Sequence, residues 1–261
     1  QPDQLGDVLH LPEVVDDREA RLDLFGVERA HCAVLAYDFT VLAGTQGHLN
    51  HRKKDRMFQL SRELRLPLVL FAEGGGGRPG DTDGDFSSRT FYDFPKLSGL
   101  VPLIGIVSGR CFAGNASLLG CCDVVIATNN SNIGMGGPAM IESGGLGLFR
   151  PEEIGPMSVQ VPSGVVDIAV ADEAEAVRVT RQYLSYFQGS LPHFTCADQR
   201  LLRKAVPENR LRVYNIRQVI ETLADVGSVL ELRPHFGRTM VTALIRIEGR
   251  AIGLVANNPM H

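Results

Sequence analysis

Three glycine-rich segments hold the residues whose types and spacing could do chemistry in this chain. Backbone N–H groups at the start of a helix lack an intrahelical acceptor and lie at the positive end of the helix dipole, so they can hold an oxyanion. In RCFAGNA, the small residues Ala113 and Gly114 would let a substrate reach such groups. The other two segments are candidate ligand-binding loops, and their residues are Gly75, Gly76, Gly77 and Arg78 in one and Gly136, Gly137 and Pro138 in the other.

The first of these loops lies in EGGGGRPGDTD, from Glu73 to Asp83. Four consecutive glycines lose too much backbone entropy to form a helix or a strand, so the segment is expected to be a loop. Its backbone could approach a ligand closely while Arg78 pairs with a phosphate or a carboxylate. Two plainer interpretations stay open. The loop could be only a flexible surface segment, and the small residues from 113 to 117 could only let a helix pack closely on its strand.

Buried strands are expected to position these loops. Apolar runs predict one or two strands within 31–43 and further strands over 68–72, 101–107 and 123–128. The last three each end in a glycine or small-residue turn. This pattern indicates an α/β fold, a spiral of strand–helix units, with the glycine loops gathered into a ligand cleft at the strand ends.

One long helix is predicted from Gly47 to Arg65. Met57, Leu60 and Leu64 are expected to face the core, and the wet face is expected to hold Arg52, Lys53, Lys54 and Asp55. Shorter helices are expected from Asp16 to Phe25 and within 87–99, while prolines keep the region from 140 to 164 rich in loops.

A second long helix is predicted from Asp172 to Gln188. Asp172 can cap its start, Glu175 sits at the capping-box position and Gly189 ends it. The residues expected to share its buried face are Val177, Leu184 and Phe187.

A second unit is predicted to begin after a linker over 190–212, which gives domains of 1–206 and 207–261. It opens with a helix from Ile216 and a hairpin formed by 240–247 and 251–256. Helix plus hairpin is too little for a domain, so the unit is expected to be incomplete. One hairpin face would expose Val241, Ala243, Ile245 and Ile247, and a strand edge would also meet water, so we expect self-association.

Familiar side-chain constellations are absent from the sequence. It holds no GxSxG, HExxH or EF-hand pattern, and His48 and His51 are expected on a helix surface without carboxylates to complete a metal site. Glu142, Glu152 and Glu153 could be acid or base groups near the cleft, or merely solvated carboxylates. Backbone oxyanion holes are the chemistry that remains.

Composition limits the possible partners. A net charge of −4 over 261 residues gives no electrostatic footprint for nucleic acid. Five cysteines, an odd number, indicate reduced thiols rather than a disulfide framework. No leader and no apolar run of the ~20 residues needed for a membrane span is visible, so a soluble cytoplasmic protein is expected.

The sequence resembles the carboxyltransferase subunits and domains of biotin-dependent acyl-CoA carboxylases, within the crotonase superfamily. The resemblance covers essentially the whole chain and rests on DFTVLAGT, EGGGGR, GRCFAGNA, MGGPAMI, PEEIGPMSVQ with SGVVD, and VYNIRQVI with ANNP. It implies a crotonase-like spiral of ββα units followed by the opening of a second domain of the same type.

The resemblance implies a thioester enolate held by the N–H groups of Ala113 and Gly114, with CoA lying along 75–78 and 136–138. The chain departs from the commoner pattern in three places. Ala113 replaces the first glycine of the pair, Asn115 follows it, and four glycines replace SGGA. An alanine keeps its N–H donor, whereas the missing serine removes side-chain hydrogen bonding from the loop.

The implied reaction transfers carboxylate from N1 of carboxybiotin to the α-carbon of an acyl-CoA. The biotin nitrogen can then take the α-proton, so the protein has to orient the substrates and stabilise the enolate. The implied cofactor is biotin on a separate carrier domain or subunit. The implied partners are the biotin carboxyl carrier, the biotin carboxylase component and further copies of the chain, with half of the active site lying outside this sequence.

Other functions stay open. The chain could be a non-catalytic acyl-CoA-binding scaffold, or another crotonase-superfamily enzyme such as a hydratase or a biotin-dependent decarboxylase. The sequence lacks paired glutamates at helix starts near the glycine loops, which disfavours the hydratase. Acyl-chain length depends on a pocket that the sequence does not define.

Overall fold

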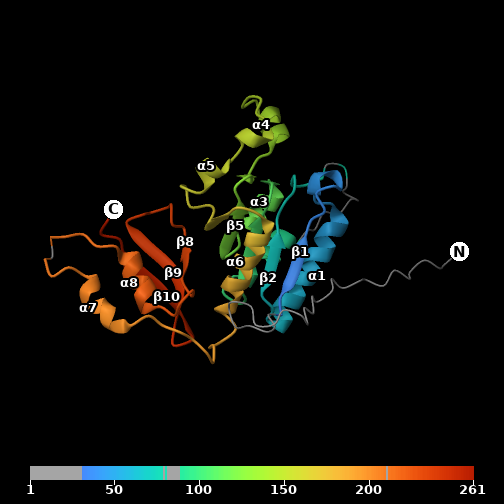
Figure 1. Ribbon diagram of the computed structural model, residues 1–261. Coiled ribbons are helices and arrows are strands. Elements are labelled where there is room, and N and C mark those ends of the chain that lie inside the picture. The colour runs from blue at the N-terminus through green and yellow to red at the C-terminus, as the bar shows by residue number, and fades with distance from the viewer. Residues whose placement is uncertain (1–30, 79, 81–88, 210) are drawn as a thin grey trace.

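The computed structural model describes residues 31–78, 80, 89–209 and 211–261. The helix expected from Asp16 to Phe25 lies outside the described residues. An α/β unit occupies most of the chain, and the C-terminal part forms a smaller unit at its side (Figure 1). Within the described ranges, no helix has the length and apolarity that crossing a bilayer requires.

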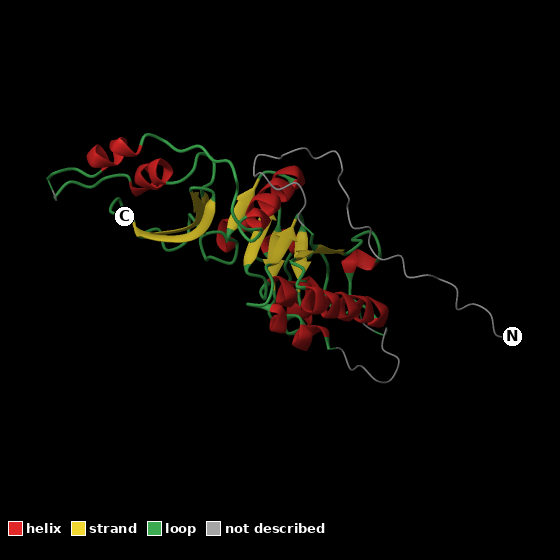
Figure 2. Ribbon diagram, turned by 90° about the horizontal axis from the view of Figure 1, so that it is seen from below, coloured by secondary structure: helices red, strands yellow, loops and turns green. Residues whose placement is uncertain are grey.

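A five-stranded parallel sheet forms the centre of the larger unit. Its strands follow the order β1-β2-β3-β5-β7. Every residue of β3 and β5 is buried, because helices cover both faces of the sheet (Figure 2). The bounds are β1 Ala33–Ala36, β2 Leu68–Phe71, β3 Leu103–Val107, β5 Val124–Thr128 and β7 Ile168–Val170.

Each face of the sheet has its own apolar core. Leu68 and Leu103 face a core shared with α1 (His48–Leu64) and α3 (Gly114–Leu119). Val69 and Ile104, one position further along, face a core shared with α6 (Glu173–Ser185). Alternate residues of a strand point to opposite faces, so both sets must be apolar. This confirms the strands expected over 68–72, 101–107 and 123–128.

Shorter elements complete this unit. A separate two-stranded parallel sheet, which the sequence patterns did not indicate, consists of β4 Arg110–Phe112 and β6 Asn132–Gly134. The short helices are α2 Thr90–Asp93, α4 Pro138–Ser143 and α5 Met157–Gln160, and single 3-10 turns cover Leu42–Gly44, Pro95–Leu97 and Pro151–Glu153. A further 3-10 turn, Gln199–Leu201, and α7 Leu202–Ala205 lie with the C-terminal unit instead (Figure 1).

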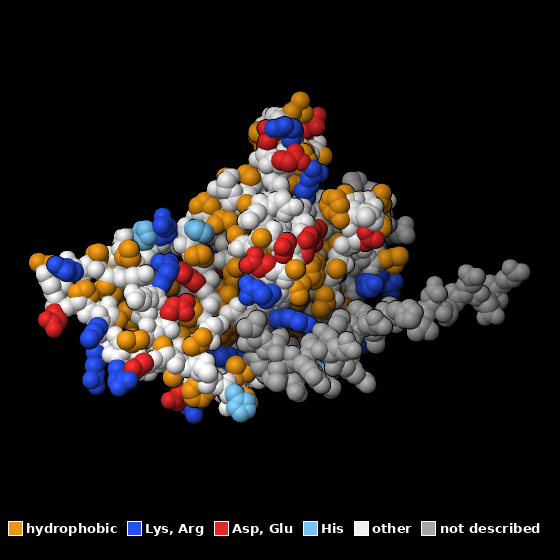
Figure 3. Space-filling view, viewed as in Figure 1, with side chains coloured by type: hydrophobic (Ala, Val, Ile, Leu, Met, Phe, Trp, Pro, Cys, Tyr) orange, Lys and Arg blue, Asp and Glu red, His pale blue; other side chains and the backbone are white. Residues whose placement is uncertain are grey.

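The segment around α4 projects from the body of the molecule (Figures 1 and 3). Its apolar side chains are largely solvent-exposed, with Met140 at 60% and Leu148 at 80%. The expectation of a loop-rich region between 140 and 164 is confirmed.

Helix α1 forms where it was predicted, and Met57 packs against the core while Arg52 and Lys53 are exposed, as expected, but Leu64 and Lys54 were placed on the wrong faces. The residues that point inward are His51, Lys54, Phe58 and Ser61. Leu64, expected in the core, is 63% exposed, whereas Lys54, expected on the wet face, is 5% exposed. The apolar pattern misplaced the face because two polar side chains of α1 have polar partners inside the protein.

Helix α6 begins as predicted and buries a different stripe. The Asp172 side chain accepts the N–H of Glu175 at 2.8 Å, which confirms the cap. Val177 and Phe187 are 42% and 50% exposed, so their expected common buried face with Leu184 is wrong. The helix packs on the sheet through Ala176, Val179, Thr180, Tyr183 and Leu184.

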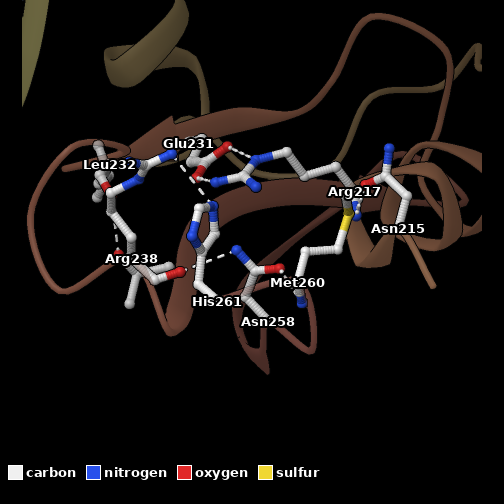
Figure 4. Close-up of polar contacts among 9 residues, drawn as sticks. Asn215, Arg217, Glu231, Leu232, Arg238, Asn258, Met260 and His261 are labelled. Carbon is white, nitrogen blue, oxygen red and sulfur yellow. Dashed lines mark hydrogen bonds and ion pairs between the residues drawn. The ribbon is translucent and has the colours of Figure 1, made fainter. Parts of the chain in front are cut away.

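The C-terminal unit is a three-stranded antiparallel sheet with one helix. Strand order is β10-β9-β8, and β9 and β10 form the expected hairpin around Glu248-Gly249. The Arg217 side chain pairs with Glu231 at 2.6 Å and so joins the helix to β8 (Figure 4). The bounds are α8 Ile216–Leu223, β8 Leu230–Leu232, β9 Met240–Ile247 and β10 Arg250–Asn257.

The hairpin face that was expected to meet water is covered. Val241, Ala243 and Ile245 are 1%, 4% and 1% exposed, because α8 packs on them through Ile220. The expected exposed apolar face was therefore wrong, whereas the expected free strand edge is present in β10, the outer strand of the hairpin. Sequence patterns treated α8 and the hairpin as separate features, although the helix supplies the missing cover.

Buried polar bonds join the two units. The Arg246 guanidinium, 3% exposed, donates to the carbonyls of Ser185 at 2.6 Å, Gly189 at 3.0 Å and Gly249 at 2.6 Å. Arg233 Nε donates to a carboxylate oxygen of Asp167 at 2.6 Å. The exact domain boundary between 206 and 207 remains a prediction.

Candidate active site

The first glycine loop packs directly against the start of α3. A Cβ added to Gly76 would lie 2.5 Å from the Cβ of Ala113 and 3.3 Å from the backbone N of Gly114. Gly76 also has a φ of +90°, a region that other residues rarely adopt. Glycine at this position therefore lets the loop backbone reach the helix start.

The second glycine loop reaches the same place through the small β4–β6 sheet. The Ala113 N–H donates to the Gly134 carbonyl at 3.0 Å. A Cβ on Gly137 would lie 3.6 Å from the Cβ of Phe112, and Pro138 is the first residue of α4. The three predicted segments thus meet around residues 112–114.

The N–H groups of Gly77 and Gly114 have no acceptor among the described residues, and the next two N–H groups of α3, those of Asn115 and Ala116, have none either. Gly114 is the first residue of α3, so the helix offers it no acceptor. The Ala113 N–H, in contrast, is engaged by Gly134. Of the residues predicted to bind the thioester, Gly77 and Gly114 therefore keep an N–H available for an outside acceptor, and the roles assigned to the whole predicted set remain predictions.

Side chains form a wall next to Gly114. A Cβ on Gly114 would lie 3.0 Å from Phe91 Cζ and 3.2 Å from Gln46 Nε2. Phe91, in α2, is 42% exposed, whereas Gln46 is 3% exposed. The site therefore has an apolar ring on one side and a buried amide on the other.

Arg78 lies beside the first loop, and its guanidinium bonds Thr45 in this structure. Nε donates to Thr45 Oγ1 at 3.3 Å and Nη2 to the Thr45 carbonyl at 3.1 Å. The backbone N–H of Arg78 donates to the carbonyl of Gln46 at 2.8 Å. Binding of a phosphate by Arg78 remains a prediction.

Sequence reasoning missed the buried polar residues behind the loop. Lys54 of α1 donates to Gln46 and to the Tyr37 hydroxyl. Burial lowers the pKa of Lys54 to about 7, and the neighbouring Asp55 carboxylate opposes this shift. The signal was present in the i, i+3, i+7 spacing of His51, Lys54 and Phe58, which the purely apolar pattern hid.

His51 is buried rather than on the surface, contrary to expectation. The Thr90 hydroxyl donates to Asp55 Oδ1 at 2.5 Å, so it accepts from His51 Nδ1 at 2.9 Å. Burial and the charge of Lys54 lower the pKa of His51 to about 4. The ring is therefore neutral near pH 7, with its proton on Nδ1.

Two of the three candidate acid and base carboxylates are held in ion pairs, and the third, Glu142, lies in α4. Glu152 pairs with Arg110, and Glu153 pairs with Arg150 at 3.4 Å. Glu73, where the loop begins, is different: burial raises its pKa, and the N–H of Ser108 donates to its carboxylate. Over the described ranges, no group of three or more His, Cys, Asp and Glu side chains could hold a metal ion.

These features define the class of chain: a crotonase-like α/β fold in which backbone amides of a glycine loop and a helix start form the candidate anion site. The chain belongs to the carboxyl transferase domain family, which matches residues 27–261. The family resemblance and the fold class are thereby confirmed.

Several known proteins are similar to this chain. It is 30% identical over 251 residues to the mitochondrial methylcrotonoyl-CoA carboxylase beta chain of Dictyostelium discoideum. The aligned region covers 90% of this chain and 42% of that protein. The solved structure of a single-chain, multi-domain long-chain acyl-CoA carboxylase matches with 58% identity and a TM-score of 0.84, over 87% of this chain and 23% of the other.

A second solved structure is that of the transcarboxylase 12S hexamer with methylmalonyl-coenzyme A bound. It matches with 27% identity and a TM-score of 0.75, over 87% of this chain and 47% of that one. The chain spans about half the length of the curated relatives it matches.

Proposed function

We propose that this chain supplies the acyl-CoA side of the carboxyltransferase site in a biotin-dependent acyl-CoA carboxylase. One observation carries the proposal: the N–H groups of Gly77 and Gly114 lack acceptors on two segments that touch at Gly76. Membership of the carboxyl transferase family supports the assignment.

The two amides would hold the thioester carbonyl oxygen. Negative charge builds up on that oxygen as the α-proton leaves, and donors already fixed in place stabilise it without reorganisation. Removing one donor of such a hole typically lowers the rate ~10²–10³-fold. Phe91 would exclude water from one side of the thioester, because its ring lies next to Gly114.

The backbone N–H groups of Gly77 and Gly114 suit the carbonyl oxygen of an acyl thioester, which needs hydrogen-bond donors and no side-chain ligands. Carboxybiotin would supply the carboxyl group and then a basic nitrogen. We place its contacts mainly on the remainder of the protein, since this chain spans about half of its curated relatives.

The proposed partners are a CoA thioester, a biotin carboxyl carrier and a biotin carboxylase component. Further copies of the chain are also proposed, with the hexameric transcarboxylase as the precedent. We propose a cytoplasmic location, and the five unpaired cysteines support a reducing compartment.

The test uses the full-length protein that contains this chain, with carboxybiotin and a panel of acyl-CoA thioesters of increasing length. Carboxylated acyl-CoA should form for at least one chain length. Binding by calorimetry without any product would favour the scaffold, and loss of a carboxyl group from a carboxylated substrate without transfer would favour the decarboxylase.

A further inference from the structure

Three buried polar side chains connect α1 to the candidate oxyanion hole. Lys54, Gln46 and Asn115 are 5%, 3% and 0% exposed, and they come from three segments far apart in the sequence. Burying such groups is unfavourable unless each is hydrogen-bonded. The pattern of their bonds shows what the burial achieves.

The bonds run in one direction from Lys54 to the glycine loop. Lys54 Nζ donates to Gln46 Oε1 at 2.5 Å, and Gln46 Nε2 donates to Asn115 Oδ1 at 2.7 Å. A protonated lysine only donates, so it fixes which end of the Gln46 amide faces Asn115. Lys54 therefore fixes the Gln46 amide in the orientation in which its Nε2 faces the Asn115 oxygen.

Asn115 connects Gln46 to the first glycine loop through two further hydrogen bonds. Its Oδ1 accepts the Gly76 N–H at 3.1 Å, and its Nδ2 donates to the Glu73 carbonyl at 3.2 Å. Asn115 follows Gly114 in α3, and Gly76 precedes Gly77. The residues next to the two candidate donors are thus bonded to each other through one side chain.

Gln46 holds the loop a second time with its backbone. Its N–H donates to the Gly76 carbonyl at 2.6 Å, and its carbonyl accepts the Arg78 N–H at 2.8 Å. Gly77 lies between these two bonds. A shift of Gln46 would therefore move the Gly77 amide relative to Gly114.

We propose that Lys54 and Gln46 are positioning residues that keep the Gly77 and Gly114 amides aimed at one oxygen. The inference rests on the proposed function, because it assigns these side chains to the same hole. Displacement of a reacting group by about 1 Å can cost ~10² in rate, so loosening the network should act on turnover more than on binding.

The test compares Lys54→Met with Lys53→Met in the full-length protein. Methionine keeps most of the side-chain length and removes the donors, while Lys53 is the exposed neighbour on the same helix. We expect Lys54→Met to lower kcat about 10- to 100-fold and to change the KM for acyl-CoA less than about 3-fold. Lys53→Met should match the wild type.

A double-mutant cycle adds a readout that a general loss of packing would not give. If Lys54 and Gln46 act as one unit, Lys54→Met with Gln46→Met should lower kcat no further than the more damaging single change. Amide exchange at Gly76 should become faster in Lys54→Met, because Gln46, one of the two groups that hold its acceptor Asn115, loses its own partner Lys54.

The outcomes separate the two proposals. A wild-type protein that transfers no carboxyl group would overturn the proposed function and this role together. A wild type that transfers, with a Lys54→Met variant that keeps the wild-type kcat or a cycle in which the losses multiply, would overturn the positioning role alone.

Discussion

Gly114 matters at the residue scale for its amide and for its missing side chain. Proline is well tolerated at the first position of a helix, where it removes only the N–H. The preceding Ala113, at φ 50° and ψ −121°, is unfavourable before a proline, so Gly114→Pro should lose stability. In the folded variant we expect carboxyl transfer to fall ~10²–10³-fold, with more acyl-CoA binding retained than turnover.

Gly114→Ala is the matched variant, because it keeps the donor and adds a methyl group. That methyl group would meet Phe91 Cζ at 3.0 Å, the end of a side chain that is 42% exposed and can shift. It would also meet the buried Gln46 Nε2 at 3.2 Å, so we expect a small loss of turnover, well below that of the proline variant. Kinetics and calorimetry on both variants, with circular dichroism to confirm folding, measure the difference. Equal rates in the proline variant and the wild type would place the hole elsewhere.

Lys54 should make stability depend on pH. Its pKa in the folded protein is about 7, below the ordinary 10.5, so between these values the unfolded chain holds a proton that the folded chain has lost. The free energy of unfolding should then rise with pH over this window, by at most ~1.4 kcal/mol per pH unit.

Urea unfolding at pH 6.5, 8 and 9.5 checks this dependence. Lys54→Met should lack the rise and should gain stability relative to the wild type toward lower pH. His51, Asp55 and Tyr37, the other titratable groups near Lys54, remain in both proteins. The pKa of His51 rises when the Lys54 charge is removed, so the comparison is read between pH 8 and 9.5, where His51 is neutral in both proteins. If the free energy of unfolding changed with pH in the same way in both proteins, the lowered pKa of Lys54 would be contradicted.

At the scale of elements, the N-terminal cap of α6 makes a contribution to stability that can be measured. Asp172→Ala removes the acceptor for the Glu175 N–H and should lower the free energy of unfolding by about 1 kcal/mol. Asp172→Asn keeps an oxygen acceptor and should cost less. Chemical denaturation of the two variants distinguishes them, and an unchanged Asp172→Ala would show that the cap adds nothing to α6.

The sequence predicted elements best where both faces of a strand are buried. Continuous apolar runs revealed β2, β3 and β5, whereas β4, β6 and β8 have three residues each and are too short to show a period. The buried faces of the helices were partly predicted wrongly, for a different reason. In α1 the inward residues include His51 and Lys54, whose partners come from other segments.

The candidate site was predictable as a set of segments but not as a set of donors. Glycine content marked all three loops, and the structure brings them together around 112–114. Which amide is unengaged depends on long-range bonds, such as that from Ala113 to Gly134. No local pattern shows that bond, nor the Gln46 bridge behind it.

At the scale of the whole molecule, Arg246 joins the two units through buried hydrogen bonds to backbone carbonyls. Arg246→Met would leave three carbonyls without this donor and should destabilise the protein by ~2–4 kcal/mol. Limited proteolysis of the connection 190–212 should become faster. Arg250→Met, at an exposed position of the same hairpin, should change neither, and equal proteolysis of the two variants would argue against the joint.

Strand β10 is the outermost strand of its sheet, and its eight residues present one edge of backbone to the outside. Val255, in its middle, is 70% exposed, and Ile252 is 42% exposed. A long edge of this kind is a template for pairing with another strand. The sheet can therefore be extended at β10. Copies of the isolated chain would pair along this edge until another strand occupies it.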